Sequence, residues 1–360
     1  MLAALAMFIA AEAAGLLAAP QAEPTRPSFS EWLAGVRTEA LARGIRQEIV
    51  DEALTDIPEP LPVVIERDRA QAEVILPLET YISRRVTPKV VKMGREVFAR
   101  HRTLLDEVGN AYGVSPRIIA GIWGLESNYG LFSGRWPTVT VLATLAWDPR
   151  RSAFFRGELF HALEILNRRD IEFARMRGSW AGAMGQVQFM PSSYLEYAED
   201  YDGDGRRDIW TSPADVFASI ANYLSGHGWD EGEGWGREVK VSKDGARRIA
   251  SEIQRRTGAC RATRDMTAML PMTRWKELGV RLPNGAALPA SGADAALVSG
   301  ATRHFLVSAN YDAVLGYNCA HSYALSVGLL ADAIGSTARV SAGPKRSSRR
   351  RPAPRARPSR

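Results

Sequence analysis

Cysteine and histidine are scarce in this sequence of 360 residues, which contains two cysteines and five histidines. Two cysteines exclude a disulfide-built scaffold and a four-cysteine zinc site. They permit one disulfide, Cys260–Cys319, which an oxidising compartment would favour over two free thiols. Five histidines are too few for a histidine-rich metal enzyme. With 46% apolar and 24% charged residues, the chain is instead typical of a folded globular protein.

The body of the chain lacks an excess of positive charge, although the formal net charge is +6. Residues 344–360 carry eight lysines and arginines and no acid, and without them 38 bases face 40 acids. A nearly neutral body argues against nucleic-acid binding. The Pro-, Arg- and Ser-rich segment 341–360 predicts a disordered basic tail. Such a tail would contact anionic envelope surfaces weakly, or would only aid solubility.

Long hydrophobic runs are absent after residue 22, so no integral membrane span is expected there. Residues 2–19 form an apolar stretch with a single charge, Glu12, and a polar, proline-containing segment follows. This pattern predicts a signal peptide over 1–22 and therefore export, although the usual basic start is missing. A membrane anchor and an ordinary alanine-rich helix are the alternatives.

The hydrophobic pattern changes along the chain. Apolar residues recur at the helical period over 29–50, 71–108 and 321–334, whereas short β-type runs separated by turns occupy 237–312. The pattern predicts a mainly α protein with a small β-containing insertion, an α+β fold. The expected parts are an N-terminal helical region 23–112, a motif-rich region 113–236, the insertion 237–312 and a C-terminal helical segment 313–340.

The most informative segment is a buried helix expected from Pro116 to Tyr129, with Ser115 as N-cap and Gly130 ending it in a left-handed conformation. Glu126 lies in its last turns, one turn after apolar residues. Burial should raise the pKa of this carboxyl by several units, whereas the helix dipole contributes less than one. Such a carboxyl suits a general acid. A core-edge glutamate bonded to backbone or to an arginine is an equal alternative.

A second motif, GSWAGAMGQVQFMPSSY, occupies residues 178–194. Its glycines allow close approach of backbone, and its neutral amides and aromatic rings suit recognition of sugar hydroxyl and N-acetyl groups. Pro191 and the two serines after it predict the start of the next helix. Taken alone, the motif is a weak ligand signal.

Several motifs in order resemble the membrane-bound lytic murein transglycosylase B family. They are GVSPRIIAGIWGLESNYG (113–130), the glycine-rich motif, DYDGDGRRDIW (200–210), SPADVFASIANYLSGHGW (212–229) and GYNCAHSYA (316–324). The resemblance covers about residues 27–335. It implies a lysozyme-like catalytic core over 113–236 and a periplasmic enzyme acting on peptidoglycan glycan strands. The implied reaction cleaves the β-1,4 bond between N-acetylmuramic acid and N-acetylglucosamine and leaves a 1,6-anhydromuramic end, with no cofactor required for chemistry.

By this resemblance Glu126 is the catalytic acid and then the base. The residues at matching substrate-binding positions are Ser179, Gln188, Tyr223, Tyr317, Asn318, Tyr323, Arg150, Arg151 and Tyr81. Core packing is the alternative for the aromatic residues. A lone carboxyl fits the reaction, because no other acid lies within ten residues of Glu126, whereas ordinary glycosidases use two. A muramidase that hydrolyses the same bond and a non-catalytic peptidoglycan-binding scaffold remain as rival functions.

The acidic run 200–208 has the spacing of a calcium-binding loop, with aspartates at positions 1, 3 and 5 and glycine at position 6. Position 12 is Thr211 instead of the usual glutamate, and the resemblance supplies a later carboxylate. The predicted ligands of a structural Ca²⁺ are Asp200, Asp202, Asp204, Arg206 through its carbonyl, and Asp215. A capping box at 212–215 and an arginine-paired loop without metal are the alternatives.

Overall fold

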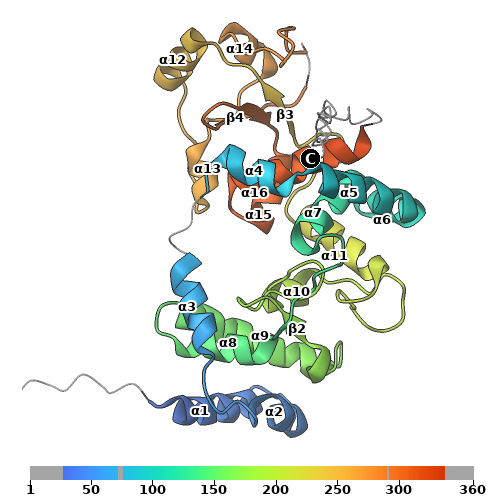
Figure 1. Cartoon of the computed structure of the whole chain (residues 1–360), viewed down its shortest axis with the longest axis vertical. Helices are drawn as coiled ribbons and strands as arrows, with labels where there is room; N and C mark the ends of the chain where they lie inside the picture. Colours follow the sequence, from blue (N-terminus) through green and yellow to red (C-terminus); the bar gives the residue numbers. More distant parts are fainter. Residues whose placement is uncertain (1–26, 72–75, 290–291, 337–360) are drawn as a thin grey trace, which may run out of the picture.

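The computed structural model describes residues 27–71, 76–289 and 292–336 (Figure 1). Sixteen α-helices, one short 3-10 helix η1 (Phe173–Arg175) and five short strands make up the described part. The predicted mainly α fold with a small β-containing part is therefore confirmed. The predicted signal peptide over 1–22 and the basic tail over 341–360 lie outside the described residues. None of the described helices is long and apolar enough to cross a membrane.

One helical group fills the lower half of Figure 1. Its members are α1 (Phe29–Ala42), α2 (Gln47–Leu54), α3 (Pro62–Gln71), α8 (Thr138–Trp147) and α9 (Ser152–Arg168). A capping box between Ser28 and Glu31 starts α1. Helix α8 packs along α9, and α2 and α3 both contact α8.

A second group surrounds the buried helix α7. Its members are α4 (Leu78–Arg85), α5 (Pro88–Arg100), α6 (Arg102–Tyr112), α7 (Pro116–Ser127), α11 (Pro213–Gly226), α15 (Asn310–Tyr317) and α16 (His321–Gly335). Helix α7 contacts α5, α6, α11 and α16. It is apolar on nearly every face, which suits a helix enclosed by others.

Two small elements connect the helical groups. Helix α10 (Pro191–Tyr197) contacts both α9 and α11. Strand β1 (Trp136–Pro137) pairs antiparallel with β2 (Arg177–Gly178). The last residue of β2 is the first residue of the glycine-rich motif. The motif therefore lies where the lower and upper helical groups meet.

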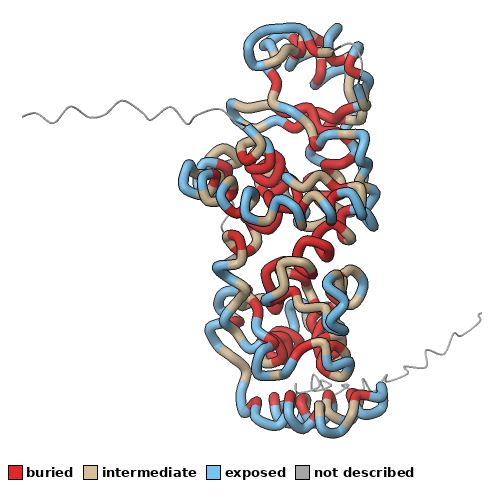
Figure 2. Tube along the Cα trace, turned by 90° about the vertical axis from the view of Figure 1, so that its right-hand side faces the viewer, coloured by how far each residue is buried: buried red, intermediate tan, exposed pale blue. Residues whose placement is uncertain are grey.

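Most of the insertion forms the upper end of the molecule in Figure 1, whereas its residues 261–265 lie lower, at the level of α4. Its elements are β3 (Gly236–Val239), α12 (Lys243–Glu252), α13 (Arg261–Asp265), α14 (Met272–Glu277), β4 (Ala296–Ser299) and β5 (His304–Val307). The strands form an antiparallel sheet in the order β3-β5-β4, in the region where short β-type runs were predicted. A separate hydrophobic core forms around Trp275, Val280 and Leu306. Figure 2 accordingly shows buried residues inside each of the stacked parts.

The two cysteines are bonded to each other. Cys260 precedes α13, and Cys319 lies between α15 and α16, with their Cα atoms 5.7 Å apart. The disulfide therefore attaches the insertion to the segment that joins the last two helices.

Helix α7 ends two residues earlier than predicted, at Ser127. Asn128 and Tyr129 both adopt left-handed conformations, with φ of 52° and 60°, so the chain turns before it reaches Gly130. Asparagine tolerates this conformation better than most other side chains. Glu126 remains in the final turn of the helix, as predicted.

Two helix starts also differ from the predicted capping. Ser115 is the N-cap of α7, but its side chain makes no capping hydrogen bond. Helix α10 begins at Pro191, and Ser192 is its second residue. The amide and hydroxyl of Ser192 donate to the Glu158 carboxylate, at 2.9 and 2.7 Å. Glu158 is buried, so it needs these donors, and the serine satisfies a carboxylate of α9 instead of a helix end.

Candidate active site

Glu126 is the penultimate residue of α7, and its side chain is partly exposed. Burial raises the pKa of its carboxyl to about 7, while the Tyr323 hydroxyl and the Arg85 guanidinium act to lower it. Desolvation therefore outweighs both neighbours that favour the charged form. Near neutral pH the carboxyl populates both protonation states, as a group that first donates and then accepts a proton requires.

Three tyrosines from distant parts of the sequence lie near this carboxyl: Tyr81 in α4, Tyr317 at the end of α15 and Tyr323 in α16. Burial is the main reason that the pKa of each is raised, and the nearby Glu126 charge adds to the effect. The rings of Tyr317 and Tyr323 stack with their centroids 6.3 Å apart. The structure thus brings together four of the predicted site residues.

The hydroxyls of two of these tyrosines have different partners. Tyr317 donates to the carbonyl of Val187 at 2.7 Å, which connects α15 to the glycine-rich motif. The Tyr323 hydroxyl is buried and makes no hydrogen bond of regular geometry to any described residue. It still lies close enough to Glu126 to lower the pKa of that carboxyl. Tyr323 therefore presents a donor to Glu126 without competition from another described residue.

Two residues of the glycine-rich motif shape its backbone. The Ser179 hydroxyl accepts from the amides of Ala181 and Ala183, at 3.3 and 3.1 Å. Gln188 has a φ of 52°, and its side-chain amide donates to the carbonyl of Gly185 at 2.8 Å. Both side chains remain partly exposed, so the turn that they stabilise also presents them at the surface of the motif.

Gln186 connects this motif to α7, a role that the sequence did not reveal. Its side-chain carbonyl accepts from the Trp123 indole at 2.8 Å, and its amide donates to the carbonyl of Trp210 at 2.8 Å. Gln186 is buried, whereas Gln188 is partly exposed. Two glutamines in one loop carry no sequence signal that separates the buried one from the accessible one.

Of two further predicted site residues, Tyr223 is buried and Asn318 is exposed. Tyr223 is 8% exposed, donates to the carbonyl of Gly316 at 2.7 Å and stacks on His227 with ring centroids 4.0 Å apart. It is therefore a core residue that supports Tyr317, whose ring centroid lies 4.7 Å away. Asn318 is exposed, and its side chain bonds to no described residue. Of the two, Asn318 is the one free to contact a ligand.

The paired arginines Arg150 and Arg151 both bind Asp68 of α3. The Nε and Nη2 atoms of Arg150 donate to the carboxylate and the carbonyl of Asp68 at 2.7 Å each, and Arg151 donates to the other carboxylate oxygen. Burial disfavours the charge on Asp68, which is 3% exposed, but these hydrogen bonds prevail and lower its pKa. The arginines thus join α3 to the start of α9. Their side chains remain 40% and 43% exposed, and their contact with substrate stays a prediction.

Arg85 was not among the predicted site residues. Its guanidinium donates to the carbonyl of Leu125, the residue before Glu126, and its charge lowers the pKa of the Glu126 carboxyl. In the sequence, Arg85 follows Arg84 at the end of a helix, where a cation commonly complements the helix dipole. Because this ordinary role explains the residue, the local sequence gives no reason to expect its contact with α7.

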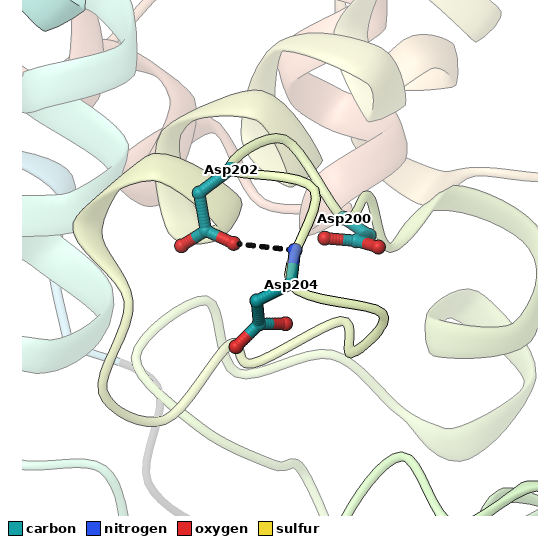
Figure 3. A group of neighbouring side chains, drawn as sticks. All are labelled: Asp200, Asp202 and Asp204. Carbon is teal, nitrogen blue, oxygen red and sulfur yellow. Dashed lines mark hydrogen bonds between the residues drawn. The ribbon is translucent and has the colours of Figure 1, made fainter.

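The three predicted loop aspartates converge in space (Figure 3). One carboxylate oxygen from each of Asp200, Asp202 and Asp204 lies within 4.8 Å of the others. The Asp204 amide donates to Asp202 at 3.3 Å, and the Gly205 amide donates to Asp200 at 2.9 Å. The second oxygen of Asp200 is buried without a hydrogen-bond partner among the described residues. An unsatisfied carboxylate oxygen beside two others fits a hard cation such as Ca²⁺.

The two remaining predicted ligands are placed differently. The amide of Arg206 donates to the Asp204 carboxylate at 2.8 Å. Asp215 is 0% exposed, and its two oxygens accept from the amides of Tyr201 and Asp208 at 2.8 Å each. Burial raises the pKa of Asp215 to about 6 against these hydrogen bonds. Asp215 thus holds the loop from inside; it lies near Asp202 but is not one of the three aspartates whose oxygens lie within 4.8 Å of one another.

Only one half of the capping box predicted at 212–215 is observed, because the Asp215 carboxylate accepts from Tyr201 and Asp208 and not from the Ser212 amide. The Ser212 hydroxyl accepts from the amide of Asp215 at 3.4 Å at the start of α11. The same hydroxyl donates to Asp202 at 2.8 Å. One serine therefore connects the acidic loop to α11, a helix that packs on α7.

Comparison with known proteins identifies the family of this chain. The family model described as Transglycosylase SLT domain matches residues 28–332. A segment of 154 residues is 40% identical to membrane-bound lytic murein transglycosylase B of Escherichia coli K12. This segment spans 42% of the present chain and 42% of that protein, so less than half of the curated relative is matched.

Solved structures match over a longer range. SltB3 from Pseudomonas aeruginosa, in complex with NAG-anhNAM-pentapeptide, is 40% identical with a TM-score of 0.76, over 85% of this chain and 79% of that chain. The Escherichia coli lytic transglycosylase Slt35, in complex with calcium, is 26% identical with a TM-score of 0.68, over 86% and 93%. Because the family model spans most of the chain and the predicted acid lies in its matched region, this protein belongs to the Transglycosylase SLT domain family.

Proposed function

We propose that this protein is a lytic transglycosylase that cleaves the glycan strands of peptidoglycan. The observation that carries the proposal is the Glu126 carboxyl, whose pKa of about 7 results from burial. Among the described residues, no second carboxylate acts on that pKa. The relatives bearing this activity in their names, and a sugar-peptide bound to SltB3, support the substrate.

In the first step, protonated Glu126 donates its proton to the oxygen that bridges N-acetylmuramic acid and N-acetylglucosamine. The electrons of the C1–O bond leave with that oxygen, and the muramic C1 becomes oxocarbenium-like. The 2-acetamido oxygen of the substrate stabilises this cation from within the sugar. The protein therefore does not need a second carboxylate as nucleophile.

In the second step, the Glu126 carboxylate accepts the proton of the C6 hydroxyl. The O6 oxygen of the sugar then forms a bond to C1. The 1,6-anhydro ring closes and the acid is regenerated, so protons and electrons balance. The Tyr323 hydroxyl and Arg85 both favour the charged carboxylate, which stabilises the enzyme between the two steps. Exclusion of water at this stage distinguishes a lyase from a hydrolase.

Mass spectrometry of muropeptides released from purified sacculi tests this proposal. We expect products with anhydromuramic ends, and we expect Glu126→Gln to release almost none. Products that carry an added water would identify the rival muramidase. Cleavage by Glu126→Gln at the wild-type rate would remove Glu126 from the mechanism. Sacculus binding by the wild type without any cleavage would identify the rival scaffold.

A structural Ca²⁺ in the acidic loop is part of the proposal. Carboxylates of Asp200, Asp202 and Asp204 and the carbonyl of Arg206 would hold the ion, and the solved structure of Slt35 with calcium supports this assignment. The ion would neutralise three neighbouring negative charges and fix the loop against α11. It takes no part in the proton transfers at Glu126.

The proposed compartment is the periplasm. The disulfide Cys260–Cys319 is typical of an oxidising compartment, and the E. coli relative is named as membrane-bound. An intact mass under non-reducing conditions that is two hydrogens below the reduced mass would support the disulfide; equal masses would contradict it. Weak contact between the basic tail and anionic envelope surfaces stays a prediction. Low-salt retention on sacculi with and without residues 341–360 tests it.

A further inference from the structure

Trp136 in β1 carries an indole ring that the proposed mechanism does not use. Its side chain is partly exposed, and the Arg67 guanidinium of α3 lies over the ring, 5.8 Å from the ring centroid. Arg67 is itself exposed, and its side chain makes no hydrogen bond or ion pair with any described residue. The pair therefore offers guanidinium donors that no protein acceptor occupies, beside an accessible apolar ring.

This pair lies between two sets of predicted substrate-binding residues. In the ladder of β1 and β2, Trp136 is opposite Gly178, the residue before Ser179. On the other side, Arg67 precedes Asp68, which binds the paired arginines at the start of α9. A ligand that contacts Ser179 and those arginines at the same time therefore comes close to the indole ring.

The segment that leads to Trp136 starts at the end of α7 and is apolar at its surface. It contains Leu131, 65% exposed, and Phe132, 55% exposed, the two most exposed large hydrophobic side chains of the described residues. The Phe132 amide donates to the carbonyl of Ser127 at 2.9 Å, directly after Glu126. Apolar side chains that are exposed next to each other mark interaction surfaces more often than scattered ones do. The segment thus presents apolar surface from the helix end that carries the acid to β1.

Backbone contacts fix this segment against the glycine-rich motif. Gly134 has a φ of 103°, and a Cβ atom at this position would collide with the backbone of Gly178. The Arg177 guanidinium also donates to the carbonyl of Arg135 at 3.1 Å. Trp136 is therefore held in place relative to the motif before any ligand arrives, as is usual for small-molecule binding sites.

The pair lies apart from the acid itself. A guanidinium close to Glu126 would lower the pKa of that carboxyl, and among the described residues Arg85 is the one cation that does so. Arg67 has no such effect. The two sugars joined by the cleaved bond are therefore positioned by other residues, and a sugar over Trp136 belongs further along the strand.

We propose that Trp136 and Arg67 bind a saccharide unit of the glycan strand away from the cleaved bond. This proposal rests on the proposed function. The faces of a pyranose ring carry C–H bonds, whose hydrogens are attracted to the electron-rich face of an indole. The guanidinium has five N–H donors for the hydroxyl and N-acetyl oxygens around that ring. The pair thereby favours long strands over short ones, whether or not the strands carry peptides.

Substrate length tests the proposal. The substrates are peptide-free glycan oligomers of increasing length, so that contacts with peptides play no part. In Trp136→Leu, which keeps an apolar side chain but removes the ring, we expect kcat/KM to fall about tenfold on long strands. It should stay within about twofold on the shortest oligomer that the wild type cleaves. Arg67→Gln should show a smaller loss in the same direction.

Two kinetic outcomes would overturn the proposal. One is a wild-type rate for Trp136→Leu on long strands. The other is an equal loss at every length, because a remote binding site cannot affect an oligomer too short to reach it. A loss that came from poor folding would also be equal at every length, so the length dependence separates binding from stability.

The matched control is Trp32→Leu in α1. Trp32 is likewise partly exposed, with the Arg156 guanidinium 5.7 Å from its ring centroid. It therefore reproduces the tryptophan–arginine pair in a helix at the lower end of the molecule in Figure 1, away from β1. This variant should keep the wild-type dependence on length. The same change in length dependence in Trp32→Leu would overturn the assignment to Trp136.

A binding measurement keeps this proposal separate from the proposed function. In the Glu126→Gln background, calorimetry with long peptide-free glycan strands should give a Kd about tenfold higher when Trp136→Leu is added. If the wild type cleaves no glycan, the proposed function fails, and the difference in Kd still decides the role of Trp136. An unchanged Kd, or no binding by either protein, would overturn the proposal.

Discussion

The end of α7 and the first turn of α11 each contain a carboxyl whose pKa is raised by burial, Glu126 and Asp215, yet the two carboxyls have different surroundings. Asp215 is fully buried, and two backbone amides satisfy its oxygens. Glu126 is partly exposed and accepts no hydrogen bond of regular geometry from a described residue. A raised pKa alone therefore does not mark an acid catalyst. Glu126 differs from Asp215 in that its carboxyl is accessible from outside.

The largest expected effect is a loss of activity when the Glu126 carboxyl is replaced. Glu126→Gln should lower kcat by about 10²–10⁴-fold, because it removes the proton donor while keeping the shape. Initial rates of anhydromuropeptide release measure this effect. The control Glu107→Gln removes an exposed carboxylate from α6 and should leave the rate unchanged.

Glu126→Gln should also change how stability depends on pH. The folded pKa of about 7 exceeds the ordinary value of 4.5, so between these values the native state holds more protons than the unfolded state. The wild type therefore loses stability as pH rises from 4.5 to 7, by about 1.4 kcal/mol per pKa unit. The variant lacks this loss, and thermal melts at both pH values measure the difference in stability between the variant and the wild type. A difference that stays constant with pH would contradict burial as the cause of the raised pKa.

Asp215→Asn should mainly affect stability. An amide side chain offers one acceptor oxygen in place of two, so one buried backbone amide loses its partner, at a cost of about 1–3 kcal/mol. Urea unfolding with a chelator present measures this difference without contributions from bound metal. A loss of kcat comparable to that of Glu126→Gln, in folded protein, would show that the two carboxyls share a role.

Calcium binding at the acidic loop should increase the free energy of unfolding. At a concentration about 100 times its Kd, a ligand adds about 2.7 kcal/mol to the free energy of unfolding, which raises Tm by about 5 °C in a protein of this size. Scanning calorimetry with Ca²⁺ and with chelator measures the shift. Asp202→Asn should remove the shift, whereas Asp244→Asn in α12 should retain it. A shift that survives in Asp202→Asn would place the ion elsewhere.

The smallest effect concerns the pH profile. The Tyr323 hydroxyl lowers the pKa of Glu126, so Tyr323→Phe should raise that pKa and move the alkaline limb of kcat/KM to higher pH. The control Tyr197→Phe removes a hydroxyl that bonds only to Glu196 among the described residues and should leave the limb in place. A limb that moves to lower pH in Tyr323→Phe would mean that the hydroxyl favours the protonated acid.

Local patterns predicted the parts of the site that depend on neighbours in sequence. The apolar run around Glu126 was enough to predict a buried helix with an acid in its last turn, and the β-type runs of the insertion became its three strands. The motif resemblance added Tyr317 and Tyr323, which no periodicity could have connected to Glu126. These two lie 191 and 197 residues further along the chain. Tyr323 reaches the acid through the packing of α16 on α7, and Tyr317 through the contacts of α15 with α11 and α16.

Long-range polar partners were beyond the reach of sequence reasoning. Arg85 acts on Glu126 from another helix, and Asp68 binds Arg150 and Arg151 across 82 and 83 positions. Nothing in either local sequence identifies such a partner, because ion pairs and side-chain hydrogen bonds are chosen by tertiary packing. The resemblance that suggested Asp215 as a calcium ligand did not reveal that its oxygens accept from the amides of Tyr201 and Asp208.

The disulfide also constrains motion. Cys319 is covalently held one residue after Asn318 and four residues before Tyr323, while Cys260 belongs to the insertion. The bond therefore limits how far the insertion can separate from the segment between Tyr317 and Tyr323, whose rings lie near Glu126.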